Sequence, residues 1–144
     1  MPAMITFQTI NVPMPAIDQT AVTAWVNAVA ASYGRRAGDI NYIFVDDEEI
    51  LRVNRRFLQH DYYTDIITFD NGNGTRFISG DLFISLDTVR TNAEGLGVSY
   101  DQELRRVVIH GVLHLCGLND KGPGERELME AAENRALELL ATNK

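Results

Sequence analysis

The segment that most constrains the fold is a pair of β-rich stretches joined by a glycine-rich turn. Residues 64–70 read TDIITFD, and residues 76–85 read RFISGDLFIS. Both are rich in the β-branched and aromatic residues that favour strands. Between them, residues 71–74 read NGNG, a sequence that favours the backbone conformation of a tight turn. The segment therefore predicts a β-hairpin, and any sheet that this chain forms must contain it.

Hydrophobic periodicity predicts two further strands and five helices. The strands are ITFQTI at residues 5–10 and INYIFV at residues 40–45. Helices are expected at residues 18–34, 46–57, 86–93, 100–116 and 125–142. The last of these should turn the following side chains inward: Leu128, Met129, Ala132, Ala136, Leu139 and Leu140. We expect one domain over residues 1–144, of the α/β (α+β) class: a sandwich in which helices pack against a mixed sheet of about four strands.

Composition narrows the class of protein. The 144 residues are 45% hydrophobic and 23% charged, as in soluble globular proteins that bury a core of their own. Apolar runs are far shorter than the ~20 residues of a membrane span, and no signal-peptide pattern opens the sequence. The single cysteine, Cys116, cannot form an intramolecular disulfide and fits a reducing compartment. A cytoplasmic protein without a membrane partner is expected.

Charge argues against general affinity for nucleic acid but leaves a local basic face. The formal net charge is -7, which disfavours broad attraction to a polyanion. Arg52, Arg55 and Arg56 nevertheless recur along one predicted helix and share part of a face. That face could bind an RNA backbone. A solvated helix face is the simpler interpretation.

Two of the three histidines lie four residues apart in the predicted helix at residues 100–116. A helix advances about 100° per residue, so His110 and His114 differ by about 40° and lie about 6 Å apart along one face. Asp120 follows Gly117, where the chain can leave the helix and fold back. Two imidazoles and a carboxylate are acceptable zinc ligands, and three protein ligands leave a position open, as in catalytic sites. The alternative is two core histidines and a solvated aspartate.

Two neighbouring residues limit the chemistry of such a site. Cys116 lies about 200° around the helix from His114, so it should face away from the ligands and act as a small apolar residue. Zinc proteases carry the histidine pair as HExxH, with the glutamate as general base. Here Gly111 occupies the position of that glutamate. A peptidase of that kind would lack its base, and the glycine should leave room beside the metal.

The segment HGVLHLCGLND, residues 110–120, closely resembles the signature of the YbeY family, bacterial metal-dependent endoribonucleases implicated in ribosomal RNA maturation. Asn54 lies ten residues before Thr64, which opens TDIITF, and this segment resembles the family's TDVLSF strand. GDLFIS, residues 80–85, resembles the family's GDI-I-S strand. The three motifs occur in the family's order and spacing.

The resemblance implies the family's α/β sandwich, with a metal site at the end of the histidine helix. It also implies a single-strand-specific endoribonuclease that acts on the 3′ end of 16S ribosomal RNA and in ribosome quality control. Its partners would be ribosomal RNA precursors and the small ribosomal subunit.

Two positions depart from the family pattern. Asp120 stands where the family usually has a third histidine, so the implied ligands are His110, His114 and Asp120. This set suits Zn²⁺, and also Fe²⁺, Mn²⁺ or Ni²⁺. Leu58 replaces an arginine thought to contact substrate in relatives. Arg55 or Arg56 could compensate for it. His60 could offer a replacement ligand, although a surface-loop histidine is the simpler interpretation.

Phosphodiester cleavage also needs an activated nucleophile and contacts to phosphate. An open-site metal can polarise the phosphate oxygen and lower the pKa of bound water towards ~7. The expected catalytic residues are His114, Asp65 and Asp81. The two aspartates lie on the adjoining strands of the hairpin and are candidate general bases. Either aspartate could instead be structural. The expected substrate-binding residues are Arg55, Arg56 and Lys121.

Two other functional classes stay open on the sequence. One is a metal-dependent hydrolase of another substrate, although Gly111 disfavours a peptidase. The other is a ribosome-associated binding protein with weak or no catalysis, which Leu58 and the acidic net charge keep open.

Overall fold

A computed structural model describes residues 4–59, 64–72 and 76–142, with side chains up to residue 140. Its sheet has four strands: β1 (Ile5–Ile10), β2 (Arg36–Val45), β3 (Ile66–Asp70) and β4 (Phe77–Ser85). The strand order is β1-β2-β4-β3. β1 and β4 both run parallel to β2, whereas β3 pairs antiparallel with β4. The predicted hairpin and the predicted mixed sheet are confirmed. Gly74 of the predicted turn and His60 lie outside the described residues.

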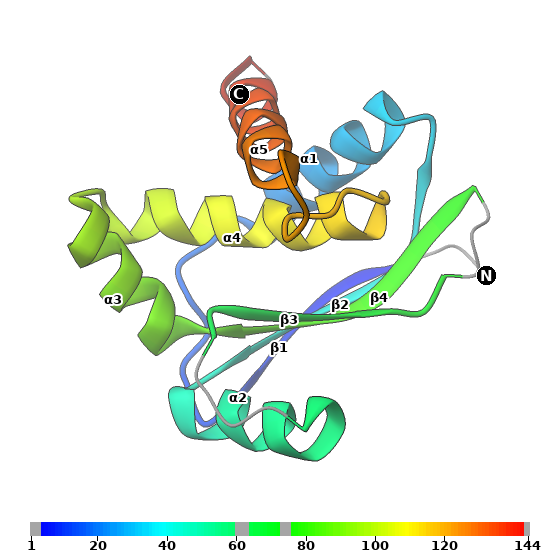
Figure 1. The fold of residues 1–144 in the computed structure, drawn as a ribbon. Coiled ribbons are helices and arrows are strands. Elements are labelled where there is room, and N and C mark those ends of the chain that lie inside the picture. The colour runs from blue at the N-terminus through cyan, green and yellow to red at the C-terminus, as the bar shows by residue number, and fades with distance from the viewer. Residues whose placement is uncertain (1–3, 60–63, 73–75, 143–144) are drawn as a thin grey trace.

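Helices cover the two faces of the sheet unequally, as Figure 1 shows. α4 lies across one face, and α5 packs on the far side of α4 next to α1. α2 and the π-helical turn η1 lie on the other face, and α3 connects β4 to α4 beyond one end of the sheet. The helices are α1 (Gln19–Ser32), α2 (Asp47–Val53), η1 (Asn54–Leu58), α3 (Leu86–Leu96), α4 (Tyr100–Leu115) and α5 (Glu125–Thr142).

The alternation of side chains along each strand divides the core in two. Tyr42 on β2 and Leu82 on β4 belong to the main core, which lies under α1 and α4. Ile43, the next residue along β2, belongs to a smaller cluster under α2. The face of the sheet under α4 is therefore the more deeply buried one, and it is the face that carries the histidine helix.

Local signals in the sequence explain most helix ends. The side chains of Asp18, Asp46 and Ser99 accept hydrogen bonds from the backbone N–H three residues later, and they are the N-caps of α1, α2 and α4. Gly34 and Gly117 follow the ends of α1 and α4 with positive φ, which glycine adopts without strain.

Two expectations need correction. β2 begins at Arg36, four residues before the predicted start, because Arg36 and Ala37 pair with Phe77 and Ile78 on β4 despite their weak apolar pattern. Leu128 is 67% exposed, whereas the sequence placed it in the core. Met129 and Ala132 form the buried face of α5, and a side chain one residue earlier is turned about 100° away.

None of the described helices is long and apolar enough to cross a membrane.

Candidate metal centre

His110 and His114 project from the same face of α4, as the sequence predicted. Their ring centroids lie 4.6 Å apart, and the ring planes are nearly perpendicular at 82°. Gly117, with φ 103°, turns the chain back after the helix and returns Asp120 to the histidines. Asp120 Oδ2 lies 3.2 Å from His110 Nε2 and 3.5 Å from His114 Nε2. The three candidate ligand atoms lie within 4.8 Å of one another.

Both histidines are oriented through their second ring nitrogen. His114 Nδ1 lies 2.9 Å from the backbone carbonyl of Leu118. Because a carbonyl can only accept, Nδ1 carries the proton, and Nε2 of a neutral His114 presents its lone pair to Asp120. A lone pair and a carboxylate repel each other, and a cation between them removes the repulsion. A metal-ligating histidine usually donates its second ring N–H to a backbone carbonyl or a carboxylate, as His114 does here to Leu118.

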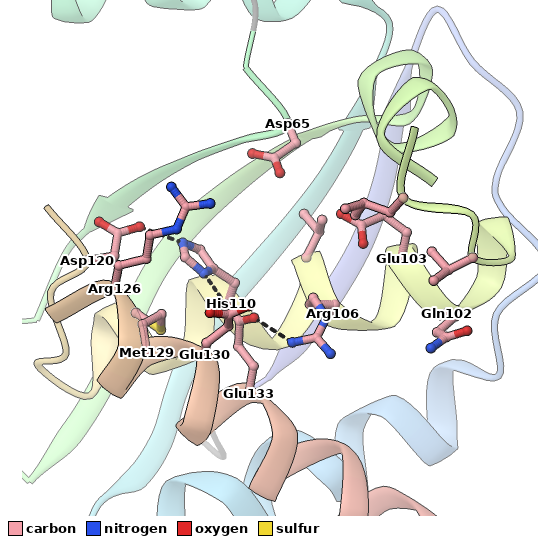
Figure 2. A pocket seen from close by; sticks show the side chains of 13 residues that line it. Asp65, Gln102, Glu103, Arg106, His110, Asp120, Arg126, Met129, Glu130 and Glu133 are labelled. Carbon is pink, nitrogen blue, oxygen red and sulfur yellow. Dashed lines mark hydrogen bonds and ion pairs between the residues drawn. The ribbon is translucent and has the colours of Figure 1, made fainter. Parts of the chain in front are cut away.

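Glu133 from α5 holds the other histidine. Its Oε2 lies 2.6 Å from His110 Nδ1, and its Oε1 accepts a 2.8 Å hydrogen bond from Arg106. Figure 2 shows His110 between Glu133 and Asp120. Burial raises the pKa of Glu133, but the hydrogen bonds from His110 and Arg106 outweigh burial and lower it. Glu133 is therefore a buried anion that orients a candidate ligand.

The pKa of His110 shows that the site favours a positive charge. Burial lowers this pKa, but hydrogen bonding and charge at Glu133, with further charge from Asp120 and Asp65, raise it overall. The same carboxylates would favour a divalent ion between Nε2 and Asp120. The donor set and its surroundings thus fit a metal ion.

Glu133 was not predicted as a site residue from the sequence. It lies on α5 among the inward-facing residues Met129, Ala132 and Ala136, and it is only 7% exposed. A charged residue within an otherwise apolar helix face was the available signal. A buried glutamate needs a partner, and the two partners here come from α4.

Asp65 comes to the site. It immediately precedes β3 and lines the same space as His110 and Asp120 (Figure 2). Burial raises the pKa of its carboxyl group, and nearby His110 lowers it only in part. Its carboxylate accepts a long hydrogen bond, 3.5 Å, from Asn92. Backbone hydrogen bonds at Asp65 and Ile66 also lower this pKa without cancelling the effect of burial, so Asp65 is a partly buried acid of raised pKa beside the candidate ligands.

Asp81 does not come to the site, which corrects the expectation of a second candidate base. Gly80 and Leu82, its neighbours on β4, face α4, so Asp81 faces the α2 side of the sheet. There its carboxylate accepts hydrogen bonds from Asn41 at 2.8 Å and Asn71 at 3.2 Å. Asp81 therefore has a structural role on the opposite face.

The candidate ligands lie where two clefts meet. The α5 cleft, about 520 Å³, lies between α3, α4 and α5. The β3 cleft, about 420 Å³, runs along β3 towards η1. Asp65, His110 and Asp120 line both clefts. An extended substrate could thus pass from one cleft to the other across the candidate metal centre.

The predicted substrate-binding residues separate in the structure. Lys121 lines the β3 cleft together with Asn54 and Leu58. Arg55 and Arg56 line a different hollow, beside Glu48 and Glu49 of α2 and outside both clefts. Leu58 and Asn54 are four residues apart and face β3, which turns the two arginines between them away from the ligands.

Gly111 and Cys116 have packing roles. A Cβ added at Gly111 would lie 2.8 Å from Ile66 Cδ1 and 3.1 Å from Leu82 Cδ2. The glycine thus permits close packing of α4 on the sheet, and the expectation that it leaves room beside the metal is wrong. Cys116 packs against the main core, and burial raises the pKa of its thiol to about 11. Its assignment as an apolar residue agrees with both observations.

Comparisons with known proteins place this geometry in context. The family model described as Endoribonuclease YbeY matches residues 5–141. A relative from Bacteroides thetaiotaomicron, named Endoribonuclease YbeY, is 66% identical over 135 residues, which cover 94% of this chain and 98% of the relative. One from Phocaeicola vulgatus with the same name is 65% identical over 138 residues, covering 96% and 99%.

The comparison of folds gives the same result. The solution structure of TM1509 from Thermotoga maritima matches with a TM-score of 0.64, covering 97% of this chain and 93% of that one. At 22% identity, this match shows a shared fold.

Proposed function

This chain belongs to the endoribonuclease YbeY family, and from that premise we propose that it cleaves single-stranded ribosomal RNA precursors at the 3′ end of 16S ribosomal RNA and acts in ribosome quality control. The family consists of metal-dependent hydrolytic nucleases, and its substrate is RNA. We further propose a cytoplasmic protein that works as one domain over residues 1–144 and associates with the small ribosomal subunit.

One observation supports the metal-dependent chemistry most directly. His110 Nε2, His114 Nε2 and Asp120 Oδ2 converge, while Glu133 and Leu118 occupy the Nδ1 atom of each ring. We assign these three atoms as the ligands of one divalent ion. Zn²⁺ is the proposed ion, and Fe²⁺, Mn²⁺ or Ni²⁺ would suit two histidines and a carboxylate as well.

Each residue at the centre then has a defined task. When bound, the ion polarises a phosphate oxygen and neutralises the charge that develops there. His110, His114 and Asp120 hold the ion, and Glu133 keeps the His110 ring in place. Asp65 is our candidate for the general base: its carboxylate would accept the proton of the attacking water, and its raised pKa makes it a better proton acceptor than an ordinary aspartate.

The β3 cleft offers a cation to the RNA backbone. Lys121 is the only lysine or arginine among the described residues that line it. It follows Asp120 directly, so we propose that it binds a phosphate next to the cleavage site. Arg55 and Arg56 would contact only RNA that extends beyond this cleft. Lys121, which lines the same cleft as Leu58, is therefore better placed than Arg55 or Arg56 to replace the arginine that relatives have at position 58.

Cleavage of a labelled single-stranded RNA tests the activity. Wild type and the variants His114→Ala, Asp120→Ala and Asp81→Asn would be assayed, each with its metal content. We expect cleavage by wild type and Asp81→Asn, and loss of cleavage with loss of metal in the two ligand variants. RNA cleavage that survives removal of the metal and of both ligands would refute the proposal.

Two measurements test the ribosomal part separately. Mapping of 16S ribosomal RNA 3′ ends after treatment of precursor particles should show shortening with wild type and none with His114→Ala. Co-sedimentation should place the protein with the small subunit. An active nuclease that neither binds the small subunit nor alters these ends would limit the proposal to general RNA cleavage.

A further inference from the structure

The α5 cleft has no task in the mechanism so far, although it opens onto the candidate ligands. Its acidic lining includes Asp65, Glu103, Glu130 and Glu133. Such a surface would repel a polyanion unless a basic side chain offset it. The basic residues of this cleft therefore decide whether RNA could enter it.

Two arginines line the α5 cleft, and they differ in their contacts. Arg106 donates hydrogen bonds to Glu133 at 2.8 Å and to Asn134 at 3.0 Å, so its charge is already compensated. Arg126, in the first turn of α5, forms no hydrogen bond or ion pair with any residue that the structure describes. Figure 2 shows the Arg126 side chain reaching towards Asp120 and His110. An available guanidinium thus lines the same cleft as His110 and Asp120.

The rest of the lining suits a nucleotide. Leu96, Val98 and Met129 give the cleft an apolar wall, and Leu96 is 65% exposed at this wall. A guanidinium forms two parallel hydrogen bonds to a phosphate, and an apolar wall can pack against a base. The volume, about 520 Å³, lies within the range of small-ligand sites.

We propose that the α5 cleft is a nucleotide subsite of the nuclease, in which Arg126 binds the phosphate next to the one that is cut and Leu96 contacts the adjoining base. This proposal rests on the proposed function, since the RNA must lie across the metal centre. The strand then runs from Lys121 in the β3 cleft to Arg126 in the α5 cleft, and a cation meets the backbone on each side of the cleavage site.

Arg126→Gln tests the phosphate contact, with Arg135→Gln as its control. Arg135 is exposed on the same helix and lines neither cleft, so both variants lose the same surface charge. With metal-loaded protein and single-stranded RNA, Arg126→Gln should raise KM about tenfold and leave kcat nearly unchanged. Its plot of log kcat/KM against log salt should become shallower by about 0.7, the contribution of one phosphate contact. Equal kinetics for the two variants would overturn the proposal.

Leu96→Gln tests the base contact, with Leu128→Gln as its control. The two leucines are 65% and 67% exposed, so neither substitution removes core packing, and Leu128 lines neither cleft. Leu96→Gln should raise KM about threefold without a change in the salt dependence, because it removes apolar contact and no charge. A KM for Leu96→Gln equal to that of the control would remove the base contact from the proposal.

Binding without cleavage separates this inference from the proposed function. A labelled DNA oligonucleotide of the same sequence carries the same phosphates, and its affinity for the metal-loaded proteins can be measured by fluorescence anisotropy. Weaker binding by Arg126→Gln than by Arg135→Gln supports the subsite even if wild type cleaves no RNA. Normal cleavage by wild type with equal binding by the two variants refutes the subsite alone. Loss of metal from Arg126→Gln would also refute it, because Arg126 would then act on the ligands.

Discussion

Asp81 and Asp65 lie on different sides of the sheet, and their carboxylates have different surroundings. Asp81, on the α2 face, accepts hydrogen bonds from two asparagine amides at ordinary distances. Asp65, beside α4, accepts one long side-chain hydrogen bond, from Asn92, and burial raises its pKa despite backbone hydrogen bonds at Asp65 and Ile66. Both residues belong to one hairpin and follow a similar sequence pattern. A carboxylate held between two amide side chains supports the sheet, whereas one whose pKa is raised by burial beside a charged cluster is available for chemistry.

The largest expected difference between the faces is in catalysis. Asp65→Asn should lower kcat for RNA cleavage by about 10²–10⁴-fold, because an amide cannot accept the proton. Asp81→Asn should leave kcat within about twofold, because it changes only the hydrogen bonds to Asn41 and Asn71. Steady-state kinetics at saturating RNA measure both values. Equal losses in the two variants would contradict the assignment of the faces.

The support of the metal ligand should show the next largest effect. Glu133→Gln removes the negative charge that holds His110 and should weaken metal affinity about 10–100-fold. The control is Glu138→Gln, an exposed change on the same helix. Competition with a chromophoric chelator measures the affinity. If Glu133→Gln bound metal as tightly as Glu138→Gln, Glu133 would have only a packing role.

The close approach of α4 to the sheet predicts a change in stability. Gly111→Val should lower the free energy of unfolding by about 1–3 kcal/mol, because its side chain would collide with Ile66 and Leu82. Gly95 lies on α3, where an added Cβ meets no atom within 4 Å, so Gly95→Ala should raise stability by about 0.5–1 kcal/mol. Urea unfolding measures both. A stable Gly111→Val variant would show that α4 can move away from the sheet.

The smallest effect concerns pH and Glu103, a buried acid on the α4 side. Burial raises the pKa of Glu103, so the folded protein holds this proton more tightly than the unfolded chain. Wild-type stability should therefore fall as the pH rises from the ordinary glutamate pKa through the raised one. Glu103→Gln should be more stable than wild type at neutral pH, and the difference should vanish in acid. Urea unfolding across pH measures it, with exposed Glu127→Gln as the control. Parallel pH curves for wild type and Glu103→Gln would contradict this origin.

Local signals explain how much of the molecule the sequence could predict. The hairpin, the N-caps at Asp18 and Ser99 and the shared face of His110 and His114 all depend on residues close together in the chain. Asp120 could also be predicted as a ligand, because Gly117 marks the point where the chain turns back after the helix. These features need only helix and strand geometry.

The remaining features depend on how distant elements pack. The role of Glu133 depends on the packing of α5 against α4. The position of Arg126 beside the candidate site depends on the α5 cleft, which three helices form together. Asp81 was misplaced because alternation shows that neighbours face opposite sides of a strand but not which side meets the histidine helix. The sequence suggested that Gly111 leaves room beside the metal, but Ile66 and Leu82 of the sheet occupy that room.

Metal content measured together with RNA cleavage tests the central claim most directly. Untagged wild type should hold about one divalent ion per chain and cleave single-stranded RNA. Three protein ligands bind one ion and leave a position open for water or substrate. His114→Ala, folded by circular dichroism, should hold none and cleave none. Folded His114→Ala that still cleaves RNA at the wild-type rate without metal would contradict the assignment of His110, His114 and Asp120 as the catalytic metal centre.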